Sequence, residues 1–110
     1  MKVAFNGFNE QTATFEVSGT VNAGEPVMVS DNGTVSAANG AFCGICVGTR
    51  AGYAAVQLGG YIRVPYSGTL SVGFAPLVGN SGKIKSDSTN GRNILVVDVD
   101  TTNHDAGIIL

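Results

Sequence analysis

Residues 19–37 read GTVNAGEPVMVSDNGTVSA, and residues 68–86 read GTLSVGFAPLVGNSGKIKS. The two stretches align without a gap, 49 residues apart, and the three glycines of the first coincide with glycines of the second: Gly19, Gly24 and Gly33 match Gly68, Gly73 and Gly82. Glycine is kept where the backbone needs a positive φ or a close approach, so we expect the turns to coincide too. The sequence therefore predicts an internal repeat.

The similarity continues more loosely after each stretch. FCGICVGTRAGYAAVQL and NILVVDVDTTNHDAGIIL both contain an apolar segment, a polar loop and a shorter apolar segment. We therefore predict a single β domain with two similar halves, residues 19–58 and 68–110, joined by a connector at 59–67. Residues 1–18 lie outside the repeat as an N-terminal arm or strand. Each half alone would leave a face exposed, and together they can close a barrel or sandwich.

Apolar residues alternate with polar ones along most of the chain, and no long window has helical periodicity. Turn signals such as Asp31-Asn32-Gly33 separate these runs, and Pro65 should lie at a sheet edge or near a strand end. The pattern predicts an all-β fold, a small glycine-rich barrel or sandwich with little or no helix. The residues expected to share a face are Ala13, Phe15 and Val17; Val27 and Val29; Ile62, Val64 and Tyr66; and Leu95, Val97 and Val99, opposite Ile94, Val96, Asp98 and Asp100.

The composition is unusually low in charge. Charged residues make up 13% of the 110 residues, against about 25% in ordinary domains. The net charge is −2, and the six Lys and Arg residues form no basic stripe or amphipathic helix. We therefore expect no nucleic-acid partner and no membrane partner. A small chain with so few charges is expected to cover part of its surface with other subunits.

Cys43 and Cys46 form the one pair of residues that suggests a metal or redox site. A structural zinc site needs four ligands, and the chain offers two Cys and one His. Three residues along a strand span roughly 10 Å and their side chains point to opposite faces, so a disulfide is not expected. The repeat sets Cys43 opposite Ile94 and Cys46 opposite Val97. Both cysteines are therefore predicted to be buried, reduced hydrophobic residues, with no metal and no cofactor.

Two further groups of residues could suggest chemistry. His104-Asp105 lacks a nucleophile as a third member, and Asp98, Asp100 and Asp105 lack the spacing of a calcium loop. We therefore predict no catalytic residues and no enzymatic activity. A lipoyl or biotinyl carrier also pairs two β halves, but the Gly82-Lys83-Ile84-Lys85 turn lacks the apolar context of an acceptor lysine.

The N-terminal segment is apolar, with Val3, Phe5 and Phe8 and few charges nearby. One interpretation is an extra strand that closes the domain. The other is an arm that adds a strand to the sheet edge of a partner.

Three stretches carry a resemblance to a known family. Gly19 to Val35 reads GxVxAGxxVxxxxxGxV, residues 42–52 read xxGIxVGxxxG, and Ala55 to Leu70 reads AVQLxGxxxVPYSGxL. In these motifs the chain resembles the capsid decoration, or cement, proteins of tailed bacteriophages. The resemblance covers most of residues 19–110 and rests on turn and strand patterns.

The resemblance implies a non-enzymatic structural protein of the virion, made in the host cytoplasm and bound to the outside of the head. Members of that family typically bind as homotrimers at three-fold positions and clamp the major capsid protein, which gives head stabilisation. An N-terminal arm often pairs with the capsid, so Val3, Phe5 and Phe8 are the expected capsid-binding residues. Lambda-type members carry a longer Thr-, Ala- and Pro-rich arm, so contact through loops remains open here.

A head-fibre or tail-associated β module that recognises a host surface is the alternative. Exposed aromatic side chains would favour it, and the residues to watch are Tyr53, Tyr61 and Tyr66.

Overall fold

The structure is a computed structural model that describes residues 11–110, which form ten β-strands. The all-β prediction is confirmed, and no helix in residues 11–110 is long and apolar enough to cross a membrane. The first sheet contains β1 (Gln11–Val17), β2 (Pro26–Asp31), β3 (Thr34–Ala37), β4 (Gly44–Arg50) and β5 (Tyr53–Gly59). The second contains β6 (Tyr61–Pro65), β7 (Gly73–Asn80), β8 (Lys83–Ser86), β9 (Arg92–Asp100) and β10 (Asp105–Ile109).

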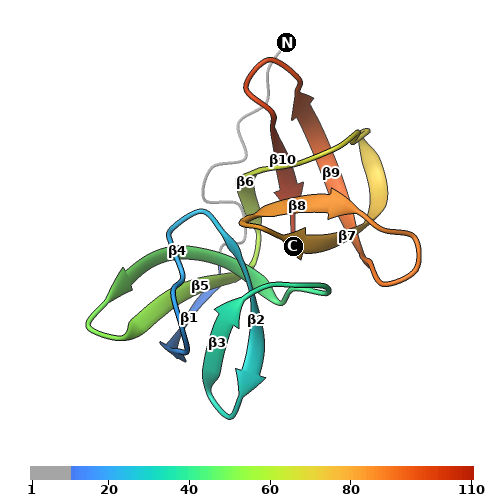
Figure 1. Ribbon diagram of the computed structural model, residues 1–110. Coiled ribbons are helices and arrows are strands. Elements are labelled where there is room, and N and C mark those ends of the chain that lie inside the picture. The colour runs from blue at the N-terminus through green and yellow to red at the C-terminus, as the bar shows by residue number, and fades with distance from the viewer. Residues whose placement is uncertain (1–10) are drawn as a thin grey trace.

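The first sheet closes into a barrel, and the second sheet curls so that one isolated bridge joins its two edges. We call them the first and the second barrel, and they lie side by side (Figure 1). The first is a closed barrel in the order β1-β3-β2-β4-β5, and the second sheet has the matching order β6-β10-β9-β7-β8. In the first barrel, β1 also pairs in parallel with β3, with Val17 opposite Val35. A single parallel bridge between Tyr66 and Ile84 joins β6 to β8 at the equivalent place. The two halves therefore share one topology.

The repeat extends further than the sequence indicated. The β2–β3 and β7–β8 hairpins coincide, because Asp31 pairs with Thr34 as Asn80 pairs with Lys83. Residues 11–17 and 61–65, which the sequence placed outside the halves, each form a strand: β1 of the first barrel and β6 of the second. The halves in the structure are therefore β1–β5 and β6–β10. QTATFEV and YIRVP share only their alternation, so alignment by identity missed them.

A β-bulge corrects the predicted faces of β9. The β9–β10 register shifts so that Asp98 pairs with Gly107 and Val96 with Ile108, which leaves Val97 unpaired. The alternation therefore changes phase at Val97, and Val99 packs against the same core as Val96, although the two were expected on opposite faces. The first barrel carries the same bulge at Val47 of β4.

Val29 also departs from the predicted pattern. It was expected to share the face of Val27, which is fully buried, yet Val29 is 54% exposed. The reason is that β2 pairs with β4 only at Pro26 and Val27, so the rest of β2 projects beyond the barrel wall. A bulge after Val29 also shifts β2 by one residue, which places Val29 where the second half has Gly79.

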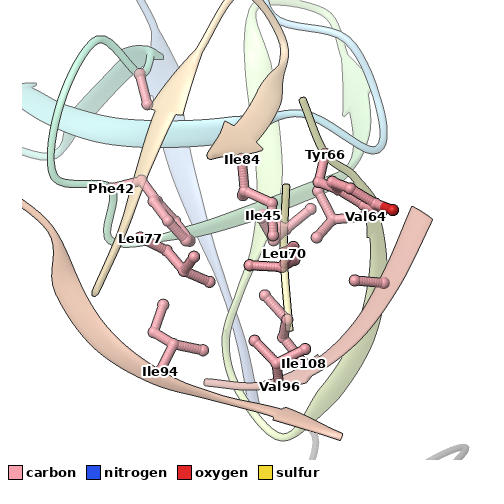
Figure 2. Packing of buried hydrophobic residues seen from close by; sticks show 12 residues of the cluster. Phe42, Ile45, Val64, Tyr66, Leu70, Leu77, Ile84, Ile94, Val96 and Ile108 are labelled. Carbon is pink, nitrogen blue, oxygen red and sulfur yellow. The ribbon is translucent and has the colours of Figure 1, made fainter. Parts of the chain in front are cut away.

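The two barrels have separate cores that meet at one end. The first core is small, and the second core takes in three side chains of the first half: Ala38, Phe42 and Ile45. Figure 2 shows Phe42 and Ile45 among the labelled side chains of the second barrel. The first half therefore closes one end of the second barrel, and the chain folds as one unit.

The backbones of the two halves approach closely at Gly79. Its N–H donates to the Gly40 carbonyl at 2.8 Å, and the Gly40 N–H donates back at 3.0 Å. A Cβ atom at Gly79 would lie 2.6 Å from the Cβ of Ala38 and 3.0 Å from the Cγ of Pro26. The second half can therefore receive the first only because this position is glycine.

Candidate functional site

An apolar row crosses the outer face of the second barrel. Strand pairing sets Phe74 of β7 opposite Leu95 of β9, and Leu95 opposite Ile109 of β10. Their chain neighbours Ala75, Ile94, Val96 and Ile108 pack in the core, so the row faces outward. Phe74 is 76% exposed, and Val72, just before β7, is 65% exposed. We call Val72, Phe74, Leu95 and Ile109 the outer row.

The first barrel has an equivalent row with a different environment. Pro26 of β2 pairs with Ile45 of β4, and Ile45 pairs with Gln57 of β5. Ile45 and Leu95 are equivalent because each lies two residues before the bulge of its strand. Pro26 and Ile45 are fully buried, and Gln57 is 3% exposed. This row is covered because it packs against the second barrel.

Gln57 shows how tightly the covered row is held. Its side-chain amide donates to the carbonyls of Gly59, at 3.0 Å, and Tyr61, at 2.8 Å. These bonds satisfy a buried polar group that would otherwise cost about 1–3 kcal/mol. In the second half the equivalent residue is Ile109, which is half-buried. The same face is thus a closed contact in one barrel and a largely open apolar surface in the other, and such surfaces mark interaction sites.

A polar clamp borders the outer row. Arg63 reaches across Gly107 to Asp98 at 2.7 Å, and its second amino group binds Asp105 at 2.6 Å. The hydrogen bond to Asp105, followed by that to Asp98, raises the pKa of Arg63. The Tyr61 ring lies over Gly107, where a Cβ atom would be 2.6 Å from the tyrosine Oη. The charges beside the row are therefore paired with one another.

The expected capsid-binding residues Val3, Phe5 and Phe8 lie outside the described residues. Their role stays a prediction.

His104 and Asp105 take part in separate contacts. The His104 ring stacks on Tyr66 with centroids 4.4 Å apart, and its Nδ1 lies 2.8 Å from the Tyr66 carbonyl oxygen. Asp105 instead binds Arg63. His104 has a φ of 59°, so it forms part of the tight turn between β9 and β10. The structure uses this histidine to fasten the turn to the end of β6.

The three aspartates considered for calcium do not converge. Asp98 and Asp105 bind Arg63, whereas the Asp100 carboxylate accepts from the backbone N–H of Thr102 at 2.9 Å and of Asn103 at 3.1 Å. The Asn103 N–H in particular lowers the pKa of Asp100. In residues 11–110, no three His, Cys, Asp or Glu side chains are grouped to hold a metal ion.

The cysteines belong to the packing of the first barrel. Cys46 is fully buried in its core, and the partly buried Cys43 packs against the same core without forming a disulfide. The expectation of opposite faces was wrong, because Cys43 precedes β4 and strand alternation does not apply to it. The registers of β4 and β9 show that Cys46 occupies the position equivalent to Val96 of the second half, not to Val97. Burial raises the pKa of both thiols, which keeps them protonated and weakly nucleophilic.

The tyrosines differ in exposure. Tyr66 is buried, Tyr61 covers Gly107, and Tyr53 is 50% exposed. Tyr53 borders an open, mainly apolar depression on the wall of the first barrel. The other residues that line it are Thr14, Gly48, Thr49, Arg50, Ala51, Ala54 and Ala55.

Sequence reasoning missed the outer row, although the repeat carries a signal for it. In the gapless alignment Phe74 stands against Glu25 and Val72 against Ala23. Strand pairing instead sets Phe74 at the place of Pro26, so the alignment indicates a difference between the halves without matching the residues that are equivalent in the structure. Comparison of the chain with protein-family models, with curated proteins and with solved structures finds no match.

Proposed function

We propose that this chain is a structural protein of a phage virion that binds the outside of the head and stabilises the capsid lattice. Its partners are the major capsid protein and further copies of itself, three at each three-fold position. The observation that carries the proposal is the outer row, with Phe74 76% exposed on a face that the first barrel buries against protein. The motifs shared with decoration proteins supply the identity of the partner.

The physical effect requires no chemistry at the bound subunit. A protein that binds only the mature shell lowers the free energy of that state by RT ln(1 + [L]/Kd) at each site, about 2.7 kcal/mol when its concentration is 100 times Kd. Many sites on one shell add such terms. A small subunit with 13% charged residues suits this role, because it can bury much of its surface in an assembly.

Val3, Phe5 and Phe8 are the proposed capsid contacts within this function. Deletion of residues 1–10 tests them directly. We expect lost attachment to heads with an unchanged β-sheet circular dichroism spectrum. If the shortened chain attaches fully, loops within residues 11–110 make the contact with the capsid instead.

The decisive experiment is the copy number in purified virions, measured by quantitative mass spectrometry relative to the major capsid protein. We expect a ratio near one to one, as for a protein that covers the shell. Complete absence from virions would overturn the proposal.

A host-recognition module of a head fibre or tail is the second candidate, and the exposed Tyr53 beside its depression favours it. This function predicts only a few to some tens of copies per virion. It also predicts that Tyr53→Ala reduces adsorption to host cells and leaves head stability unchanged. The capsid function predicts unchanged adsorption for the same variant.

A further inference from the structure

Within residues 11–110, each copy of the chain has one open row and one barrel end that no second barrel closes. We propose that the outer row of one copy packs against the open end of the first barrel of a second copy, so that the chain assembles head to tail. The inference names the self-contact of the proposed function and rests on that function only for the number of copies. The contact within the chain, between its first and second halves, is the precedent.

The internal contact shows what such a row does when it is covered. Pro26 and Ile45 of the first row, with Phe42 beside them, close the end of the second barrel at Gly79. Every side chain of that row is buried. The outer row occupies the same face of a barrel with the same topology and has a large aromatic residue where the first row has proline. It is therefore suited to a barrel end of the same kind.

The first barrel offers that kind of end. In the second barrel, Val64 and Tyr66 at this place are almost fully buried. Their equivalents in the first barrel, Phe15 and Val17, are only half-buried, although both pack against the first core. Val29 adds an apolar side chain that is 54% exposed. The end formed by Phe15, Val17 and Val29 is the acceptor surface.

The two surfaces differ from the internal pair in a compensating way. Val29 stands where the second half has Gly79, so a backbone approach as close as the internal one is blocked. On the other side, Phe74 stands where the first half has Pro26. Val29 would hold the two surfaces further apart than glycine does, and the larger Phe74 side chain can fill that wider gap. The contact within the chain packs Pro26 against Gly79. The contact between copies would pack Phe74 of one copy against Val29 of the other.

This contact joins two different surfaces, so it is heterologous. Heterologous contacts generate closed rings when the rotation closes and filaments when it does not. At a three-fold position, three copies would place six barrels around one ring, with internal and intermolecular contacts in alternation. Arg63 binds both Asp98 and Asp105 beside the row, so the three groups together carry only one net negative charge.

The test uses the free, full-length protein in analytical ultracentrifugation over a wide range of concentrations. We expect the wild type to self-associate, and Phe74→Glu and Val29→Glu each to remain monomeric at tenfold higher concentration. Each variant keeps one intact surface, so an equimolar mixture should form a one-to-one pair that does not grow. Val47→Glu is the matched control, since Val47 is 42% exposed and belongs to neither surface. Circular dichroism and urea unfolding confirm that each variant is folded.

Three results would overturn the inference: a wild type that stays monomeric throughout, a Val29→Glu variant that associates like the wild type, or a mixture that forms no pair. The copy number in virions separates this inference from the proposed function. If Phe74→Glu associates normally but is lost from virions, the outer row binds the capsid, so the inference fails and the proposed function holds. If the chain associates head to tail but is absent from virions, the inference holds and the proposed function fails.

Discussion

Ile45 and Leu95 occupy equivalent places in two barrels of one topology, yet Ile45 is fully buried and Leu95 is half-exposed. The barrel does not set this difference, because the strand order matches and β4 and β9 carry the same bulge two residues after Ile45 and Leu95. It depends on what covers the outer face. The first half covers its row with the second half, whereas the second half keeps an apolar row with Phe74 at its open end. One repeated unit thus serves once as internal packing and leaves an exposed apolar row in its second copy, which we propose binds a partner.

The largest expected effect is a difference in the loss of unfolding free energy between alanine substitutions in the covered row and in the outer row. Ile45→Ala should lower the free energy of unfolding by about 2–5 kcal/mol, because it leaves a cavity between the barrels. Leu95→Ala should cost less than about 1.5 kcal/mol, since its side chain is already partly in water. Urea unfolding of both variants under dilute conditions measures the difference. Equal losses would mean that the two rows are covered to the same extent.

The second effect concerns the exchange of Gly79 and Val29. Gly79→Val should destabilise the protein by about 1–3 kcal/mol, because its side chain would collide with Ala38 and Pro26. Val29→Gly should change stability less, since the valine side chain is 54% exposed. Thermal unfolding compares the two. A Gly79→Val variant as stable as the wild type would contradict the close approach of the halves.

A smaller effect is expected at the cysteines. Cys46→Val introduces the residue type that the second half has at the equivalent Val96, and this swap should cost less than about 1.5 kcal/mol. Cys43→Val combined with Cys46→Val should leave assembly and metal content unchanged. Size measurement and elemental analysis check both points. Lost binding in a folded double variant would give the thiols a role beyond packing.

The smallest effect is a pH dependence confined to the second half. Backbone N–H groups hold the pKa of Asp100 below its usual value near 3.9, so its stabilisation of the β9–β10 turn is complete above that pH. The stabilisation is lost as the pH falls through the lower folded value. The β4–β5 turn has Arg50 at the equivalent place and should not respond. Amide exchange of Thr102 and Asn103 between pH 2 and 6, with Asp100→Asn as control, tests this; equal acid sensitivity of both turns would contradict it.

The sequence predicted the fold class but not the bulges, the first strand of each half or the surface. Glycine spacing and alternation predicted an all-β fold with two similar halves, because positive-φ turns and the two-residue period are local properties. The bulges at Val47 and Val97 were not predicted, because an extra residue in a strand does not change the composition of the segment. β1 and β6 were left outside the repeat because they share no identical residue at equivalent places.

The outer row was missed for a different reason. Whether Leu95 or Ile45 is covered depends on contacts between segments far apart in the chain, which alternation does not encode. The one signal in the sequence was the contrast of Phe74 with Glu25 in the gapless alignment, although strand pairing sets Phe74 at the place of Pro26.

The measurement that tests the central claim most directly is thiol labelling at the two equivalent positions. Ile45→Cys and Leu95→Cys are prepared in a background that carries Cys43→Val and Cys46→Val, and each is labelled at low and at high protein concentration. We predict that the thiol at position 45 stays protected at both concentrations. The thiol at position 95 should react quickly when dilute and become protected as copies associate. Equal labelling of the two positions, or protection of position 95 in the dilute monomer, would contradict the claim that one row is internal packing and the other is a surface for a partner.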